Sequence, residues 1–198
     1  MNAPDMRDEV ADPPHQYLAA ERVMGAMAAS GRRRLEHLDP LRVLLLAVLG
    51  GGFITAGALF STLLADGFTS PGAKDLVAGL GFSTGFFFVI LSDAVLFTEA
   101  NVVLPAVLLH RAGSWRRVAR FWALAWVGNL LGAFLLGSAL AVAQVFPAGM
   151  VEELTGFVAK KMAYADVGTA GAWGRLVLSG VLANWLVGMA AFFSVMGR

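Results

Sequence analysis

Long apolar runs separated by short polar stretches divide most of this chain into segments of membrane-spanning length. The runs cover residues 41–65, 76–109, 121–146 and 174–196. A helix rises about 1.5 Å per residue, so roughly 20 residues cross a hydrocarbon core of about 30 Å. We therefore predict four membrane-spanning helices within one membrane domain, residues 41–198.

The second run is interrupted midway by polar side chains, at a depth where the bilayer is hydrocarbon. The interrupting residues are Ser92, Asp93, Thr98, Glu99 and Asn101. An acid at that depth costs about 2.5–3.5 kcal/mol on insertion scales, so it rarely lacks a role. Non-helical backbone is tolerated there only where protein buries it or where it lines a cavity.

This interruption predicts a broken second membrane helix with two halves. The first half covers residues 76–91, a loop covers residues 92–99, and the second half covers residues 100–109. Transporters commonly place their substrate path at such broken helices near the bilayer midplane. The rest of the chain is expected to support this loop.

Outside the apolar runs, the chain carries two further segments with helical character. Residues 1–40 form a leader without the apolar core of a cleavable signal peptide. Within it, residues 1–14 are expected to be disordered, and residues 16–29 predict a short amphipathic helix. That helix could lie on the membrane surface, against the protein, or in solvent without a role. Residues 147–173 are of mixed polarity and predict a partial helix outside the membrane.

Small residues and lone amides mark where the predicted helices would touch. Three consecutive glycines, residues 50–52, remove side chains over almost a turn. They serve either close helix packing or the thinning of a helix around a pore. In the third run, residues 128–132 place two glycines four apart around Asn129, and we expect this amide to bind a neighbouring helix. Asn184 is a second lone amide within the fourth run.

Composition supports an all-α integral membrane protein. The 198 residues are 58% hydrophobic and 15% charged, whereas soluble domains are about 45–50% apolar and about 25% charged. The net charge of +1 offers no attraction for nucleic acid, so no nucleic-acid partner is expected. With no Cys and three scattered His, we expect no metal site and no cofactor.

The distribution of Lys and Arg predicts the orientation in the bilayer. Arginines are concentrated before the first run and in residues 110–120, whereas the other two connections hold few net positive charges. Basic segments remain in the cytoplasm. We therefore expect a multi-pass protein of the inner or plasma membrane, with its N-terminus cytoplasmic.

Five short motifs together resemble the formate/nitrite transporter family. They are residues 82–85 (FSTG), 96–98 (LFT), 128–133 (GNLLGA), 180–187 (GVLANWLV) and 194–198 (SVMGR). Each motif alone is weak, but their order and spacing are specific. The resemblance covers residues from about position 32 to the end of the chain.

The resemblance implies an aquaporin-like helical bundle, assembled as a homopentamer with one pore in each protomer. It implies passage of small monovalent anions, such as formate, nitrite or hydrosulfide, or of their conjugate weak acids, and no enzymatic activity. Two apolar constrictions would flank a central chamber. By position, the path would comprise Phe82 at the outer constriction, Phe86, Leu96 and Val187 at the inner one, Thr98 in the chamber and Asn184 in support, with Phe97 and Glu99 beside them.

The chain departs from the family pattern in three respects. The family has six membrane helices, of which four are present here, so the chain is expected to be a truncated product or to need a second chain. The family's central His has no counterpart. Glu99 stands where most members have Ser, and we expect it to hold a proton or to pair with Arg111 or Arg116.

Two other classes of function remain open from the sequence. A non-transporting membrane subunit would use its intramembrane polar residues only to hold helices together. An intramembrane enzyme would need a constellation of reactive groups at depth. Asp93 and Glu99 are the only deep acids, and a spacing of six does not place them on one helical face.

Overall fold

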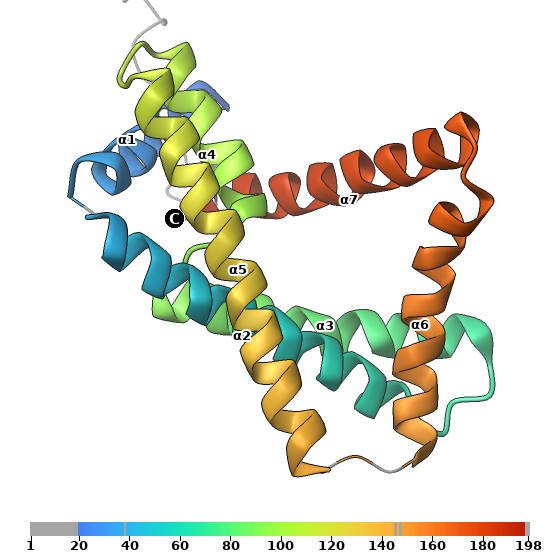
Figure 1. Ribbon diagram of the computed structural model, residues 1–198. Helices are drawn as coiled ribbons and strands as arrows, with labels where there is room; N and C mark the ends of the chain where they lie inside the picture. Colours follow the sequence, from blue (N-terminus) through green and yellow to red (C-terminus); the bar gives the residue numbers. More distant parts are fainter. Residues whose placement is uncertain (1–19, 38, 145, 147, 197–198) are drawn as a thin grey trace, which may run out of the picture.

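The computed structural model describes residues 20–196 except 38, 145 and 147, and these residues form seven α-helices and no strand (Figure 1). The helices are α1 (Ala20–His37), α2 (Pro40–Ala65), α3 (Pro71–Ser92), α4 (Phe97–Leu109), α5 (Trp115–Ala143), α6 (Ala148–Val167) and α7 (Ala170–Met196). The expected disorder of residues 1–14 lies outside the described residues.

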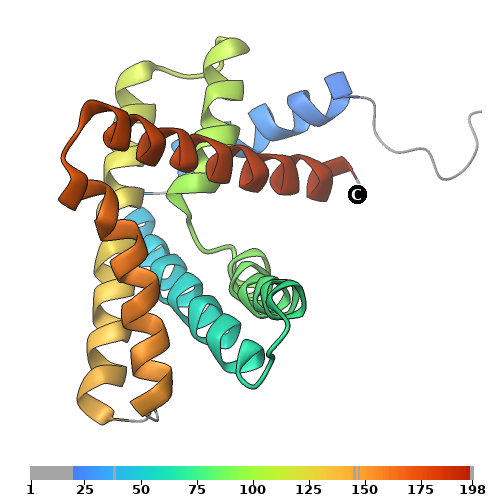
Figure 2. The ribbon, with the colours of Figure 1, turned by 90° about the vertical axis from the view of Figure 1, so that its right-hand side faces the viewer.

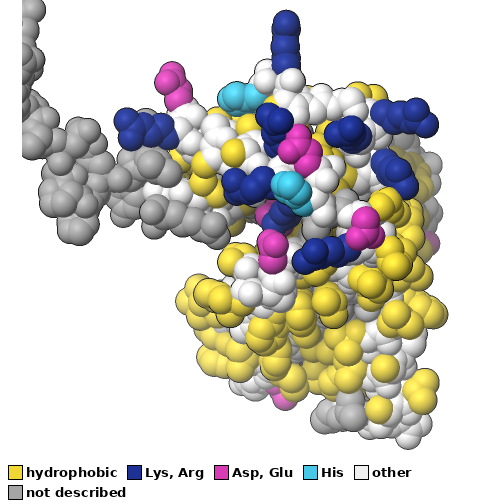
Figure 3. All heavy atoms as spheres, turned by 90° about the vertical axis from the view of Figure 1, so that its left-hand side faces the viewer, with side chains coloured by type: hydrophobic (Ala, Val, Ile, Leu, Met, Phe, Trp, Pro, Cys, Tyr) yellow, Lys and Arg dark blue, Asp and Glu magenta, His cyan; other side chains and the backbone are white. Residues whose placement is uncertain are grey.

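Four of these helices, α2, α3, α5 and α7, are long and apolar enough to cross a membrane. Large apolar side chains cover their outer surfaces, as at Leu91 and Phe134. Figure 3 shows this hydrophobic surface below a cap of charged side chains at the end where α1 lies. The protein therefore has the all-α integral membrane fold that its composition predicts, with α3 and α4 as the two halves of a broken helix.

The observed helix boundaries differ from the predicted ones both at the break and at the starts of three helices. Residues 93–96 separate α3 from α4, so the break is shorter than the predicted loop over residues 92–99. Phe97, Thr98 and Glu99 belong to the first turn of α4. Elsewhere α3, α5 and α7 each begin four to six residues before the predicted spans.

Helix α2 lies at the centre of the bundle and packs closely against α5 and α3 through glycines. A Cβ atom on Gly132 of α5 would clash with the Val48 carbonyl of α2. A Cβ atom on Gly57 of α2 would lie 3.0 Å from the Cα of Gly85 in α3. Small residues let helix backbones approach one another where there is no apolar driving force between helices. Of the two uses open to residues 50–52, close packing applies to Gly50 and Gly51, which both meet neighbouring backbone.

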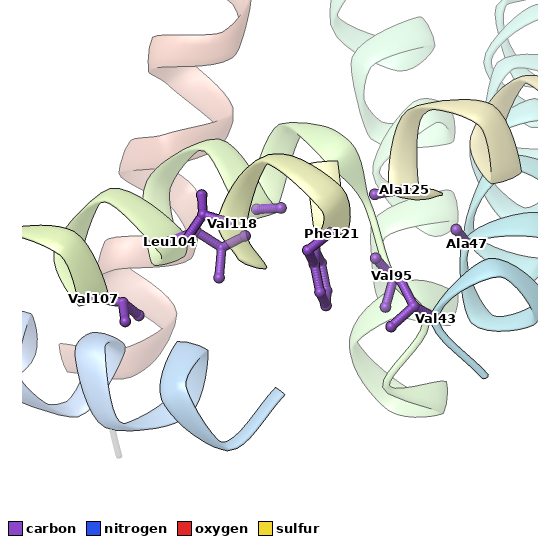
Figure 4. Packing of buried hydrophobic residues seen from close by; sticks show 9 residues of the cluster. Val43, Ala47, Val95, Leu104, Val107, Val118, Phe121 and Ala125 are labelled. Carbon is purple, nitrogen blue, oxygen red and sulfur yellow. The ribbon is translucent and has the colours of Figure 1, made fainter. Parts of the chain in front are cut away.

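The main buried core lies where α2, α4 and α5 meet the break (Figure 4). Val95, within the break itself, is 1% exposed and packs with Val43 and Ala47 of α2. Leu104 of α4 and Phe121 of α5 also belong to this cluster. Non-helical backbone at this depth is thus covered by protein, as the bilayer requires.

Helix α1 is docked on the protein, which answers the question of where the leader helix lies. Val23 and Met27 are buried against Val103 and Ala106 of α4, with the end of α7 beside them. The helix also continues past residue 29, to His37. The predicted start at residue 16 lies outside the described residues.

The last two helices form a separate arm of the bundle. Helix α7 crosses beside α4 and ends near α1 (Figure 2). Helix α6 connects α5 to α7 and stands away from α5 (Figure 1). An ion pair between Lys74 and Glu153 joins α6 to the start of α3. A helix is therefore present within residues 147–173, as predicted.

Candidate functional site

The break in the membrane helix consists of one residue with left-handed backbone conformation, followed by a short extended segment. Asp93 has φ 54°, ψ 29° and ends α3, with its N–H bonded to the Val89 carbonyl. Asp enters this conformation more readily than most residues because its short polar side chain can bond locally. Leu96 is extended (φ −109°, ψ 136°), and α4 begins directly after it.

Asn129 of α5 holds this extended segment in place. Its Nδ2 donates to the carbonyls of Ala47 and Val95, each at 2.8 Å. Its Oδ1 accepts from the Phe97 N–H, also at 2.8 Å. Asn129 therefore caps α4 and satisfies backbone groups of the break that lipid could not satisfy. The predicted interhelical role of Asn129 is confirmed, and its capping of α4 explains why that helix begins at Phe97 rather than at residue 100.

A cavity of about 840 Å³ lies beside the break, among α2, α3, α4, α5 and α7. Seven of the eight predicted path residues line it: Phe82, Phe86, Leu96, Phe97, Thr98, Asn184 and Val187. No charged residue is among its lining residues in the part of the chain described. The break thus opens onto a mainly apolar space with a few polar groups, which is the usual character of a small-molecule site.

Two aromatic rings form the α3 wall of this cavity. Phe82 and Phe86 lie one turn apart, with ring centroids 5.6 Å apart and planes at 71°. This edge-to-face arrangement is favourable for aromatic pairs. Phe86 also packs against the small buried cluster of Val89, Ala94 and Leu96. The aromatic wall is therefore anchored to the break.

The polar face of the cavity includes a residue that the motif resemblance does not place on the path. Asn101 of α4 donates from Nδ2 to Oδ1 of Asn184 in α7, at 3.5 Å. Asn101 lies three positions after Thr98, and residues three apart share one face of a helix. This spacing could have identified Asn101 once α4 was known to begin at Phe97. Thr55 and Trp126 also line the cavity, and no sequence pattern singled them out as path residues.

Glu99 is the one predicted path residue that lies away from this cavity. It lines a smaller cavity of about 130 Å³ together with Arg34 and Asp93. Arg34 of α1 contacts the Glu99 carboxylate at 3.2 Å and the Asp93 carboxylate at 3.1 Å. The predicted pairing of Glu99 with Arg111 or Arg116 is therefore wrong. Docking of α1 on α4 brings in an arginine that lies 65 residues away in the sequence.

Comparison with known proteins decides the family to which this arrangement belongs. A model of the formate/nitrite transporter family matches residues 21–198. The chain belongs to the formate/nitrite transporter family. Because that family consists of transporters and channels, the intramembrane enzyme considered from the sequence is excluded.

Three relatives illustrate the extent of the similarity. A probable formate transporter of Methanothermobacter thermautotrophicus is 28% identical over 184 residues, which are 86% of this chain and 67% of the relative. Formate channel FocA of Escherichia coli (strain K12) is 30% identical over 162 residues, 80% of this chain and 55% of that protein. A formate-nitrite transporter of Entamoeba histolytica is 28% identical over 160 residues, which are 80% of this chain and 44% of that protein. The chain thus spans between 44% and 67% of the length of these relatives.

Proposed function

We propose that this protein provides a passive or proton-coupled path across the membrane for small monovalent anions or their conjugate weak acids. Formate, nitrite and hydrosulfide are the substrate class. The observation that carries the proposal is the cavity at the helix break, because seven of the residues predicted from the family resemblance converge on it from three helices and the break. Phe82 and Phe86 would form apolar constrictions, and Thr98 would present its hydroxyl to the chamber.

The character of the cavity wall supports passage of weak acids. An apolar slit strongly disfavours a bare anion, because the ion loses water without gaining a partner. A neutral acid enters at a much lower cost. The first turn of α4, including Phe97 and Thr98, also borders the cavity, and a helix N-terminus carries partial positive charge. This end of α4 would draw an anion towards the cavity.

Glu99 is compatible with an anion path because its charge is paired. A fixed carboxylate beside the path would repel anions if it were free. Arg34, which is 17% exposed, offsets part of that charge at a contact distance of 3.2 Å, and it also contacts the exposed Asp93 carboxylate. Glu99 also lies on the smaller cavity rather than on the wall of the larger one. The ion pair would therefore separate the carboxylate from the permeating species.

We further propose the orientation and assembly that the sequence predicts. Arginines from the end of α1 and the start of α5 lie at one end of the bundle, where Leu35, Arg117 and Arg120 border a common pocket. This basic end would face the cytoplasm of an inner or plasma membrane. The exposed apolar surfaces of α3 and α7 would meet lipid or neighbouring subunits of a homopentamer.

A non-transporting membrane subunit is the alternative from a different class. The three bonds of Asn129 favour the alternative for that residue, since they hold the break and α4 in place and bind no solute. A flux assay in proteoliposomes with formate, nitrite, acetate and hydrosulfide separates the two functions. We expect flux of at least one of these substrates above that of protein-free vesicles. Intact, folded oligomers that conduct none of them would contradict the proposal and favour the alternative.

A further inference from the structure

We propose that Asn101 and Asn184 form a recognition site for the neutral form of a small oxoacid, in which an O–H group lies next to a C=O or N=O group. This inference rests on the proposed function, because it names the species that would pass and a residue that would select it. The family motifs do not place Asn101 on the path, so its assignment comes from the structure.

Among the described residues, five hydroxyl or amide side chains line the large cavity, and two of them already bond to the backbone. Thr55 donates its hydroxyl proton to the Gly51 carbonyl at 3.0 Å. Asn129 uses its oxygen and its nitrogen on three backbone groups around the break. A ligand in the cavity is therefore left with Thr98, Asn101 and Asn184 as partners that can accept a hydrogen bond, and with the indole N–H of Trp126 as a further donor.

The bond between Asn101 and Asn184 leaves most of the hydrogen-bonding capacity of both amides unused. A side-chain amide has two N–H donors and an oxygen with two lone pairs. The contact uses one N–H of Asn101 and one lone pair of Asn184, and its length of 3.5 Å is at the outer limit for a hydrogen bond. The Asn101 oxygen and the Asn184 N–H groups can therefore bind a ligand.

An acceptor beside a donor is complementary to a neutral oxoacid. The acid O–H would donate to the Asn101 Oδ1, while the neighbouring C=O or N=O accepted from the Asn184 Nδ2. A carboxylate or nitrite ion offers acceptors only, so its oxygens would repel the Asn101 oxygen. Hydrogen sulfide lacks a strong oxygen acceptor. The site would thus distinguish formic and nitrous acids from their anions and from hydrosulfide.

The absence of lining charge strengthens this preference for the neutral acid. Along the described chain, the cavity wall presents no lysine, arginine or histidine to balance an anion. Transfer of an unpaired ion into apolar surroundings is far more costly than transfer of a neutral polar group that finds hydrogen bonds. Thr98, on the same face of α4, provides a third polar contact without a charge.

The test compares three proteins in proteoliposomes: wild type, Asn101→Leu and Thr62→Val. Asn101→Leu retains the branched shape and the number of side-chain heavy atoms but removes the acceptor and the donors. Thr62→Val is a matched control on α2, because it also removes a polar group, and that hydroxyl bonds only the Ala58 carbonyl outside the large cavity. Flux of formate, nitrite and hydrosulfide is measured from pH 5 to 8, and the flux into protein-free vesicles is subtracted.

We expect Asn101→Leu to lower formate and nitrite flux roughly tenfold at each pH, as for the loss of a ligand hydrogen bond. Any hydrosulfide flux should change less than twofold, and Thr62→Val should resemble wild type. Equal losses for all three substrates, or no loss of formate flux, would overturn the proposal. If Asn101→Leu does not fold, Asn101→Ala gives the same comparison, because it also removes the acceptor and the donors. Absence of flux in wild type would instead contradict the proposed function itself.

Discussion

The guanidinium of Arg34 in α1 lies 3.2 Å from the carboxylate of Glu99 in α4, and the same side chain contacts Asp93 at 3.1 Å. One arginine from the leader helix therefore joins the two residues that flank the break in the membrane helix. Glu99 is 27% exposed and Arg34 is 17% exposed, so the pair is shielded more than a surface ion pair. The break is thus supported from α1 on one side and from Asn129 of α5 on the other.

Removal of Arg34 should destabilise the protein by leaving Glu99 without its partner. We expect Arg34→Gln to lower the free energy of unfolding in detergent by about 1–3 kcal/mol. The double variant with Glu99→Gln should recover part of that loss, with a coupling of about 1 kcal/mol in the cycle. Arg32→Gln is the matched control, because its pair with Glu36 is more exposed, and its effect should stay below about 0.5 kcal/mol. Additive single effects would show that the pair is not coupled.

Replacement of Asn129 should be the most damaging single amide substitution. Asn129→Leu leaves the Phe97 N–H and the Ala47 and Val95 carbonyls without this partner. Each unsatisfied buried group costs about 1–3 kcal/mol, so we expect loss of the folded peak in size-exclusion chromatography. Asn184→Leu serves as the control for stability, since the Asn184 side chain accepts one long hydrogen bond, at 3.5 Å from Asn101. An Asn129→Leu protein as stable as the Asn184 variant would contradict the capping role.

Two glycines of α5 should respond in opposite directions to alanine. Gly132→Ala places a methyl group against the Val48 carbonyl of α2, so we expect a loss of roughly 1–3 kcal/mol from overpacking. Gly137→Ala meets no atom within 4 Å and should stabilise the helix by about 0.5–1 kcal/mol. Unfolding midpoints of the two variants in the same detergent measure the difference. Similar midpoints would show that α2 and α5 are not in close contact at Gly132.

The aromatic wall should limit which solutes pass. Phe86→Ala removes one ring of the pair whose centroids lie 5.6 Å apart, so formate flux should rise and acetate should gain entry. We expect the ratio of acetate to formate flux to increase severalfold, since a methyl group is worth about 1–3 kcal/mol in a tight apolar pocket. Phe134→Ala removes an exposed ring on the outside of α5 and should leave this ratio unchanged. An unchanged ratio in Phe86→Ala would remove Phe86 from the constriction.

Much of the fold follows from local sequence, because long runs of apolar residues encode the membrane spans. The four spanning helices, the break in the second of them and the presence of a helix in α6 were all predictable. The site was partly predictable as well. The resemblance to the family motifs assigns Thr98 and its neighbours to the path, and seven of the predicted residues line one cavity.

The extent of the break was not predictable, because it depends on a partner from another helix. Polar residues at positions 92–99 suggested a longer loop, but Asn129 provides a cap that lets α4 begin at Phe97. Glu99 shows the same limitation. Its nearest arginines in the sequence lie after α4, whereas its partner Arg34 arrives only because Val23 and Met27 dock α1 on α4.

By itself the sequence determined the number of apolar spans, the place of the break and the family, since hydropathy and motif spacing are properties of the linear chain. Only the tertiary structure decided which polar groups are used by the backbone and which remain available in the cavity. Asn129 and Asn101 are both amides within apolar helices, yet three backbone bonds occupy the first and one long contact leaves the second largely available. That difference arises from the distances between helices, which residue type and spacing do not specify.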